Sequence, residues 1–321
     1  MSLPSNVVRL SDLPWVDAAR PREAYACHTR SLDALPLTTI GAHFVRLPAG
    51  KRSVVLHHHL REEEMFYVMS GSLRVHELLP EAQDLRTYDL VAGDLVAYPP
   101  GTWIAHQFEA LEDCVFLALS NLVPGDVCVY PTSGKVMLRG MSMVGIWADH
   151  EPMIDIVREA AAHRQSVPAT ELPKHAVRAE RVPWADLSDN VSGRALARKA
   201  GATMVMVNQD RLDPGGLSSP LHWHRFEEEL VLVLDGTATL RQVYDGHEQR
   251  VTLSEGDLAH FAPNDQVAHQ IINESGAPAT LLVIGTHVAD EVVVFPETER
   301  IYSRTLGHVG SLIERPYWDG E

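Results

Sequence analysis

The chain has 321 residues, and at about 150 residues per domain this length predicts two domains. Apolar residues make up 45% and charged residues 22%, the ordinary mixture of a soluble globular protein, and the net charge of −16 argues against nucleic acid or an anionic membrane as partner. No apolar run approaches the ~20 residues of a membrane-spanning helix, and three cysteines without a CxxC pair, after a start that lacks a secretory signal, favour the reducing cytoplasm.

The chain is rich in short segments with the composition of β-strands. β-Branched and aromatic residues dominate these segments, and Gly, Pro, Asn or Asp interrupt them at intervals of about ten residues. They include RSVVLHHH (52–59), MFYVMSG (65–71), SLRVHEL (72–78), CVFLALSNL (114–122), ELVLVLDG (229–236) and TLLVIGTHV (280–288). This pattern is typical of an all-β sandwich or barrel, and we expect only a few short helices beside it.

One segment in the middle of the chain has the composition of a helix and a linker. Residues near 152–165 have helical composition after a proline, which suits the first turn of a helix. Pro168 and Pro173 then mark a linker. We therefore expect an N-terminal domain over residues 1–167, with the linker helix near its end, and a C-terminal domain over residues 168–321.

The two halves of the chain repeat one pattern. LHHHLREEEMFYVMSGSL (56–73) recurs as LHWHRFEEELVLVLDGTA (221–238), with the shared spacing His-x-His, four residues, Glu, six residues, Gly. Downstream, GDLVAYPPGTWIAHQF (93–108) recurs as GDLAHFAPNDQVAHQI (256–271) at almost the same offset. A duplication explains such nearly constant offsets, so we expect two barrels in tandem.

Each half contains three histidines and a glutamate placed like metal ligands. Side chains two residues apart on a strand share one face, so His57 and His59 point the same way. Glu64 opens the next strand and can place a carboxylate beside the pair, and His106 lies on a later strand. The predicted ligands are His57, His59, Glu64 and His106 in the first barrel, and His222, His224, Glu229 and His269 in the second.

Three neutral imidazoles and one carboxylate suit a divalent transition metal. We expect one ion per barrel, with Fe or Mn first and Ni, Zn or Cu as alternatives. Such an ion would keep open positions for water, dioxygen or a chelating substrate. The alternative is a decayed barrel that holds no metal, although neither half has lost a ligand type.

These motifs resemble those of the cupin superfamily, and the whole chain resembles a bicupin. The first cupin motif, G-x5-HxH-x3,4-E-x6-G, is matched from His57 to Gly71 and again from His222 to Gly236. The second motif, G-x5-P-x-G-x2-H-x3-N, is matched in part, because its histidine comes two residues late in both halves. The resemblance implies two tandem double-stranded β-helix barrels of the jelly-roll type, each with a metal inside. Barrel faces commonly dimerise in this superfamily, which leaves a homodimer open.

Other polar side chains are expected to lie outside the two centres. Because alternation lets only one of two adjacent residues face inward, the glutamates beside the ligands are expected to be solvated or in surface ion pairs. These are Glu62, Glu63, Glu227 and Glu228, and Glu63 is also an alternative ligand in place of Glu64. Histidines without a match in the other half are expected at the surface or the rim; they are His43, His76, His150 and His260.

The centres suit three classes of function. By resemblance, cupins with three histidines and one glutamate often act as dioxygenases, so an Fe- or Mn-dependent oxidoreductase is the first hypothesis, with Glu64 or Glu229 as ligand or catalytic base. The second hypothesis is a lyase or isomerase that uses the metal as a Lewis acid. The third is a non-catalytic metal- or ligand-binding protein, like the seed-globulin branch of the superfamily.

Comparison with named cupin activities narrows the first hypothesis. Oxalate decarboxylases usually carry an arginine three residues before the first ligand histidine, where this chain has Val54 and Ser219, and this departure argues against oxalate chemistry. Ring-cleaving gentisate and salicylate dioxygenases normally lack the ligand glutamate. Flavonol dioxygenases keep three histidines and a glutamate in a bicupin frame, so theirs is the nearest named activity.

We expect a small, largely apolar or aromatic substrate. If the ligands face inward, apolar residues two or four positions away share that face of the strand. The predicted pocket residues are Phe66, Val68, Ile104 and Phe108 in the first barrel, and Val231, Val233, Val267 and Ile271 in the second. Hydrophobic walls around a few polar groups suit an organic ligand, and the net charge would repel anions. The alternative is that these residues fill the barrel core and leave no cavity.

Overall fold

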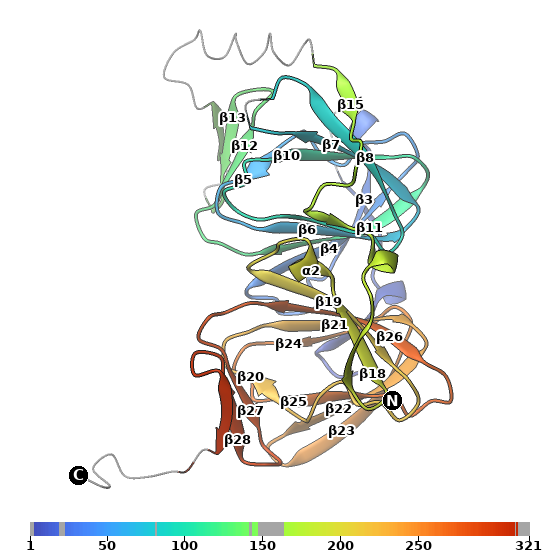
Figure 1. Cartoon of the computed structure of the whole chain (residues 1–321), viewed down its shortest axis with the longest axis vertical. Coiled ribbons are helices and arrows are strands. Elements are labelled where there is room, and N and C mark those ends of the chain that lie inside the picture. The colour runs from blue at the N-terminus through green and yellow to red at the C-terminus, as the bar shows by residue number, and fades with distance from the viewer. Residues whose placement is uncertain are drawn as a thin grey trace, which may run out of the picture.

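The computed structural model describes residues 3–18, 23–80, 82–140, 143–146, 164–311 and 313. It consists almost entirely of β-strands, which form two barrels stacked along the long axis of the molecule (Figure 1). The first barrel, blue to green, comes mainly from the N-terminal half, and the second, yellow to red, mainly from the C-terminal half. The predicted all-β fold with two tandem barrels is therefore confirmed.

Helical structure in the described part of the chain is limited to short turns. They are the 3-10 turns Leu10–Asp12, Glu23–Tyr25 and Ala179–Arg181, and the helix α2 (Leu196–Lys199). The helix predicted near 152–165 lies outside the described residues, apart from its last two positions. Among the residues described, none belongs to a helix long and apolar enough to cross a membrane.

Three sheets build the first barrel. The seven-stranded sheet runs in the order β16 (Ala176–Val177), β9 (Leu95–Tyr98), β6 (Glu64–Ser70), β11 (Cys114–Asn121), β4 (Ile40–Leu47), β3 (His28–Ser31) and β2 (Val16–Asp17). The facing sheet runs β10 (Ala105–Ala110), β7 (Ser72–Leu78), β8 (Leu85–Val91) and β15 (Ser166–Pro168). A third, small sheet stands at one end of the barrel and runs β14 (Met143–Ile146), β13 (Lys135–Leu138), β12 (Val127–Tyr130) and β5 (His58–His59).

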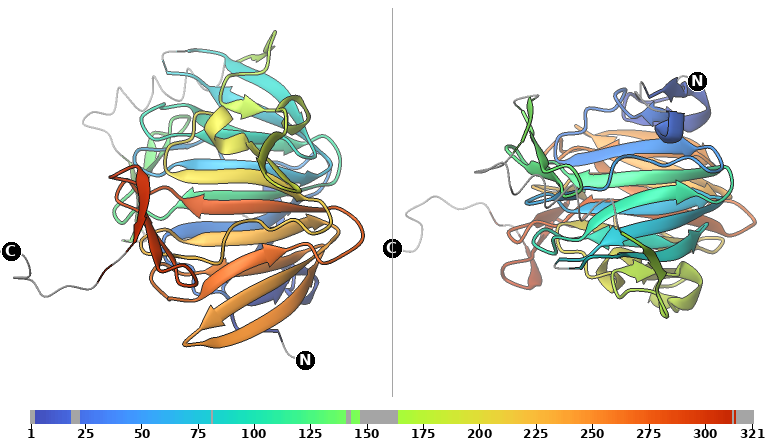
Figure 2. Two further views of the ribbon diagram at one scale, coloured as in Figure 1. Left: turned by 60° about the horizontal axis from the view of Figure 1, so that its bottom comes forward. Right: turned by 90° about the horizontal axis from the view of Figure 1, so that it is seen from above.

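The second barrel repeats this arrangement. Its seven-stranded sheet runs β1 (Val7–Arg9), β24 (Asp257–Phe261), β21 (Glu229–Asp235), β26 (Ala279–Thr286), β19 (Val205–Leu212), β18 (Val191–Ala195) and β17 (Ala185–Ser188). The facing sheet runs β23 (His247–Ser254), β22 (Thr237–Tyr244) and β25 (Ala268–Ile272), and the end sheet β20 (Trp223–His224), β27 (Val292–Phe295), β28 (Arg300–Ser303) and β29 (His308–Ser311). Both end sheets stand on the same side of the molecule (Figures 1 and 2).

The two halves exchange strands across the boundary predicted near residue 167. β1, at the start of the chain, pairs with β24 of the second barrel. β15 and β16, at and beyond the predicted boundary, pair with β8 and β9 of the first barrel. Each exchanged strand covers the unpaired edge of a sheet, which would otherwise expose free backbone N–H and C=O groups. The division into residues 1–167 and 168–321 stays a prediction, and the sheets themselves are not divided there.

The largest hydrophobic core lies between the barrels, where the two seven-stranded sheets pack face to face. Met65 and Leu117 of the first barrel and Leu230 and Leu282 of the second point into this interface and are at most 1% exposed. The opposite faces of the same strands form the interiors of the barrels. Because both faces are buried, a strand such as ELVLVLD (229–235) is apolar at almost every position instead of alternating.

Two buried glutamates tie the barrels together. The carboxylate of Glu63 accepts backbone N–H bonds of 2.6–3.2 Å from residues 203–205, at the start of β19. Glu228 of the second barrel accepts bonds of 2.6–2.8 Å from residues 38–40, at the start of β4. Both glutamates are 0% exposed, so the expectation that they are solvated is wrong. The face that points away from the ligands is covered by the other barrel.

The turn that follows β6 and β21 requires glycine. Gly236 has a φ of +81°, and a Cβ there would lie 2.7 Å from the carbonyl oxygen of Pro278. We expect Gly236→Ala to lower the free energy of unfolding by about 2–4 kcal/mol, because backbone strain adds to this clash. Gly246 has a φ of +73°, but a Cβ there would have no atom within 4 Å. Gly246→Ala therefore introduces the backbone strain without the clash and should cost about 1 kcal/mol. Urea unfolding measures both, and equal losses would show that the contact at Gly236 contributes nothing.

Candidate metal centres

The same backbone bridge brings two ligand histidines together in each barrel. His57 and His106 exchange N–H···O bonds of 3.3 and 2.8 Å, and His222 and His269 exchange bonds of 3.2 and 2.8 Å. Directly opposed residues of an antiparallel pair share a face, so their rings lie side by side. The ring centroids are 4.8 Å apart in the first barrel and 4.6 Å apart in the second.

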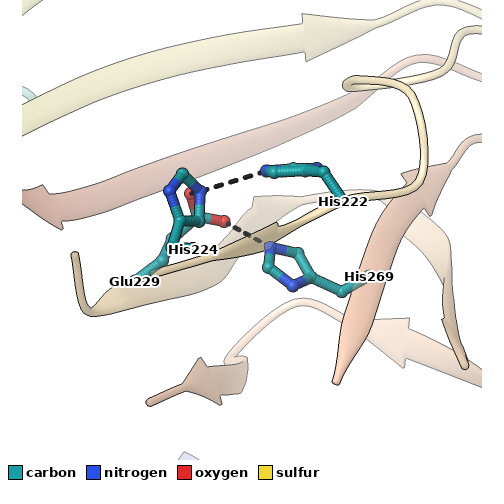
Figure 3. A group of neighbouring side chains, drawn as sticks. All are labelled: His222, His224, Glu229 and His269. Atoms are coloured by element: carbon teal, nitrogen blue, oxygen red, sulfur yellow. Dashed lines mark hydrogen bonds and ion pairs between the residues drawn. The ribbon is translucent and has the colours of Figure 1, made fainter. Parts of the chain in front are cut away.

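All four predicted ligands of the second barrel point toward one another (Figure 3). The Nε2 atoms of His222 and His224 lie 3.1 Å apart. The two carboxylate oxygens of Glu229 lie 3.3 Å from Nε2 of His269 and 3.5 Å from Nε2 of His224. Each of the four offers one atom within 4.8 Å of all the others, so the structure groups the four residues named from the sequence.

The spacing of these atoms fits a shared metal ion. Nitrogen and oxygen ligands lie about 2.0–2.2 Å from an ion such as Zn²⁺, so adjacent ligands around one ion are about 3.0–3.5 Å apart. In the second centre Nδ1 of His222 lies 2.9 Å from the carbonyl of Pro220, whereas Nδ1 of His224 lies 3.3 Å from Glu291 as an ion pair without hydrogen-bond geometry. If both imidazoles are neutral and both Nδ1 atoms carry the proton, the facing Nε2 atoms are both acceptors, and either a metal cation between them or an added proton on one ring resolves this conflict.

The charges of the second centre also favour a cation. Burial and the nearby His269 lower the pKa of His222 to about 3. Burial would lower the pKa of His224 as well, but Glu229 and Glu291 outweigh it and raise that pKa to about 10. In the protein without an ion, a proton on His224 therefore supplies the positive charge that the two carboxylates require.

The first centre brings together the same four ligand types with looser geometry. Oε2 of Glu64 lies 3.1 Å from Nε2 of His106 and 3.6 Å from Nε2 of His57, and Oε1 lies 3.5 Å from Nε2 of His59. Glu64 Oε2 and His106 Nε2 are buried and have no hydrogen-bond partner of acceptable geometry. Such orphaned buried atoms are costly unless an ion or water completes them, so this donor set fits a metal as well.

A cysteine distinguishes the first centre from the second. The sulfur of Cys128 groups with His57 and His59, whereas Glu64 and His106 group with His57 alone. Cys128 lies opposite His59 in the β12–β5 pair, where the second barrel has Val293 opposite His224. Burial raises the pKa of the Cys128 thiol to about 12, so it is a neutral neighbour of the histidines in the protein without an ion.

In each barrel a second acidic residue lies beside Nδ1 of a ligand histidine, on the side of the ring that faces away from the centre. Oδ2 of Asp126 lies 2.5 Å from Nδ1 of His59, as Glu291 lies beside Nδ1 of His224. Both carboxylates are at most 1% exposed. A carboxylate on Nδ1 fixes the ring so that Nε2 faces the centre. Sequence reasoning missed both residues, although they stand at equivalent positions, four residues before Tyr130 in VYP (129–131) and four before Phe295 in VFP (294–296).

The remaining glutamates of the EEE runs are not solvated either. Glu62 and Glu227 are 1% and 7% exposed and pair with Arg139 and Arg304. Burial is the reason that the expectation fails, because the loops before β6 and β21 fold against the end sheets. Glu63 is excluded as a substitute ligand, since its carboxylate faces the other barrel.

The histidines without a repeat partner lie in different environments. His43 is exposed, as expected, and His150 lies outside the described residues. His76 and His260 are 6% and 2% exposed, so the prediction of a surface position is wrong for both. His260 belongs to β24 in the inter-barrel interface, where its Nε2 lies 2.8 Å from Glu228. Its position on a sheet with two buried faces explains the error.

The predicted pocket residues lie mainly in the barrel cores. Six of the eight are at most 7% exposed: Phe66, Val68, Phe108, Val231, Val233 and Ile271. Phe66 packs against Phe108 with ring centroids 4.5 Å apart and against the ligand His106 at 5.4 Å. Ile104 and Val267, each two residues before a ligand histidine, are partly exposed. The six therefore form packed layers next to the ligands, and their role as pocket walls stays a prediction.

A substitution of Glu291 tests whether the carboxylate beside Nδ1 of His224 strengthens metal binding at the second centre. Glu291→Gln should weaken Mn²⁺ binding at the second centre by about 10- to 100-fold, because the ring of His224 loses its charged partner. Isothermal titration calorimetry measures the affinity. Glu297→Gln, which alters an exposed ion pair with Arg241, is the matched control and should bind like the unaltered protein. Equal affinities for the two variants would show that Glu291 does not support the centre.

Comparisons with known proteins agree with this architecture. The sequence matches the family described as "Cupin domain" over residues 43–120 and 209–285, once in each half. Oxalate decarboxylase from Bacillus subtilis at pH 4.6 is similar in structure, with a TM-score of 0.58 and 19% identity over 88% of this chain and 76% of that chain. The formate complex of Lactobacillus farciminis oxalate decarboxylase has a TM-score of 0.59 and 18% identity over 89% and 87%. No curated protein matches the sequence.

A further structure of the Bacillus subtilis oxalate decarboxylase concerns its Mn(II) centres. It has a TM-score of 0.59 and 18% identity, and the match covers 91% of this chain and 80% of that one. At such low identity the likeness shows a shared fold of two barrels in one chain. It does not show a shared reaction.

Proposed function

The chain carries two cupin domains in tandem, and on this premise we propose that it is a metal-dependent oxidoreductase of dioxygenase type that acts on a small, largely apolar or aromatic substrate. The observation that carries the proposal is the convergence of His222, His224, Glu229 and His269 on one point. Four protein donors leave two positions of a six-coordinate ion open, enough for a substrate and dioxygen. Fe or Mn, one per barrel, is the proposed cofactor.

A bound Fe or Mn ion would supply a Lewis acid and one-electron redox chemistry. The chain itself holds and orients the reacting groups. His222 and His269 are fixed by their backbone bridge, and His224 is fixed by Glu291. Glu229 presents two oxygens to different imidazoles, so the oxygen not used as a ligand can accept a proton from the substrate. Glu64 has the corresponding role in the first barrel.

Aromatic side chains beside the ligands support an apolar or aromatic substrate. In the first barrel the ring of Tyr130 stacks on that of His57, with centroids 6.0 Å apart. Phe295 lies in the equivalent place beside His222, at 6.2 Å. Both aromatic residues belong to the end sheets and are partly exposed. A flat organic substrate that approaches the metal-binding residues would contact these rings.

A lyase reaction is the second candidate. The fold likeness to two oxalate decarboxylases favours it, since those enzymes break a carbon–carbon bond of a dicarboxylate. Against oxalate itself stand Val54 and Ser219, which occupy the positions where those enzymes usually carry an arginine.

One experiment separates the two reactions. The protein is loaded with Fe²⁺ or Mn²⁺ and incubated with a panel of flavonols, catechols, enols and dicarboxylates, while dissolved dioxygen and released carbon dioxide are recorded. For a dioxygenase we expect metal-dependent dioxygen consumption with at least one aromatic or enol substrate. Carbon dioxide release from a dicarboxylate without net dioxygen consumption would instead establish the lyase, and no metal-dependent turnover of any class would contradict both.

A further inference from the structure

A tyrosine backed by a buried carboxylate lies next to the first centre. The ring of Tyr98 stacks on that of His106, with centroids 3.8 Å apart and an angle of 10° between the planes. The Tyr98 hydroxyl donates to Oε1 of Glu77 at 2.9 Å. In the sheets, Tyr98 lies opposite Glu64, and Glu77 lies opposite His106. Both residues therefore flank metal ligands from neighbouring strands.

Glu77 is the centre of a charged network. It is 0% exposed, and its Oε1 also receives a bond of 2.5 Å from the hydroxyl of Tyr88 and lies 2.7 Å from Nε2 of His175. Arg86 donates two bonds to Oε2. Burial alone would raise the pKa of Glu77, but His175, Tyr88 and Arg86 outweigh it and lower the pKa to about 2. The carboxylate is therefore ionised.

The second barrel has the same geometry with uncharged residues. Phe261 stacks on His269 at 3.6 Å and 12°, and Gln242 lies opposite His269. Gln242 accepts a bond from Asn6 and donates one to Gln249, each of 3.1 Å. By register, the equivalent pairs are Glu77 and Gln242, Tyr98 and Phe261, Tyr88 and Val251, Arg86 and Gln249, and His175 and Asn6. Every ionisable group of the network has a neutral counterpart.

The fold itself does not require the charges. A buried ionic network is often no more stable than well-packed neutral residues of similar size, and the second barrel forms the same sheets without it. Beside a reactive centre, in contrast, a fixed carboxylate orients a ligand and provides an electrostatic field that is in place before the reaction. The difference between the barrels therefore points to function at the first centre.

We propose that Glu77 is a positioning residue that fixes the hydroxyl of Tyr98 beside His106, and that the reaction takes place in the first barrel, where Glu64 rather than its counterpart Glu229 accepts the proton of the substrate. This inference rests on the proposed function for the existence of a reaction, but the action of Glu77 on the first centre does not depend on it. The second centre then binds its metal without the charged network, as a supporting site.

The test replaces the network by the residues that the second barrel already uses. Glu77→Gln and Tyr98→Phe should each lower kcat by about 10- to 100-fold with KM nearly unchanged, because substrate binding is not altered. Metal content should stay near that of the unaltered protein. Gln242→Leu, which disrupts the neutral network of the second barrel, is the control and should keep the original kcat. In Mn²⁺-loaded protein, Glu77→Gln should change the electron paramagnetic resonance signal of one of the two sites.

The two claims fail in distinguishable ways. A Glu77→Gln protein with intact metal content, unchanged kcat and an unchanged resonance signal would overturn the positioning role. Loss of activity in Gln242→Leu equal to that in Glu77→Gln would overturn the assignment of the reaction to the first barrel. If the unaltered protein shows no turnover, the proposed function and the assignment of a reactive barrel both fall, and the resonance signal still decides the role of Glu77.

Discussion

Glu228→Ala is expected to lower the free energy of unfolding by about 3–5 kcal/mol, the largest single effect on stability among the substitutions considered. The carboxylate accepts bonds from three backbone N–H groups of the first barrel and from His260, all in the interface between barrels. Its removal leaves these donors buried without a partner, which costs far more than an ordinary hydrogen bond contributes. Chemical denaturation followed by circular dichroism measures the loss.

The matched control for this prediction is Glu274→Ala. Glu274 also makes an ion pair, with Arg250, but at the surface, where solvent screens the charges, so its loss should cost much less than the loss of Glu228. Glu63→Ala, at the equivalent place in the first barrel, should resemble Glu228→Ala. A cost at Glu228 no larger than that at Glu274 would show that the buried anchor does not hold the barrels together.

The same residue predicts the behaviour of the protein in acid. Burial would raise the pKa of Glu228, but His260 and the backbone N–H groups of Thr39 and Thr38 outweigh it and lower the pKa to about 2. The folded pKa is thus below the unfolded one, so the stabilisation is complete above about pH 4.5 and is lost as the pH falls toward 2. The loss amounts to about 3 kcal/mol. Glu228→Gln should show a correspondingly flatter decline of stability over this range.

Glu229→Gln is expected to cause the largest loss of metal affinity. The substitution keeps the shape of the side chain but removes the negative charge that faces His224 and His269. Loss of a ligand charge should weaken binding at the second centre by more than about 100-fold, beyond the effect expected for an outer carboxylate such as Glu291. Competition with a chelator, followed by elemental analysis, measures the affinity.

The control for the ligand assignment is the first barrel of the same molecule. The centres share no ligand, so the Glu229→Gln protein should keep one metal equivalent, held by His57, His59, Glu64 and His106. Conversely, replacing His57 and His59 with Ala should leave the second centre filled. Loss of metal from both centres in either variant would contradict the independence of the two sites.

The features that the sequence predicted well are those that repeat. His-x-His on a strand places two imidazoles on one face by geometry alone, and the second copy at a nearly constant offset excludes coincidence. All four ligands of the second centre accordingly meet in the structure. Asp126 and Glu291 also repeat, and the same comparison of the two halves was sufficient to find them.

The features that the sequence could not predict depend on how the barrels pack. Alternation indicates that Glu63 and Glu228 point away from the ligands, but it does not tell what covers that face. Here the other barrel covers it, and the carboxylates bind backbone N–H groups about 140–190 positions away in the chain. Glu77 likewise required the register of β7 with β10, which places it opposite His106 and which no local pattern encodes.

The most direct test of the account is an anomalous difference map from crystals of the full chain grown with Mn²⁺. Two peaks are expected, one in each barrel. The first should lie among the Nε2 atoms of His57, His59 and His106 and the carboxylate of Glu64, and the second among those of His222, His224, His269 and Glu229. Saturated crystals with no peak at either position, or with peaks only at surface carboxylates, would contradict the claim that this chain is built around two metal centres.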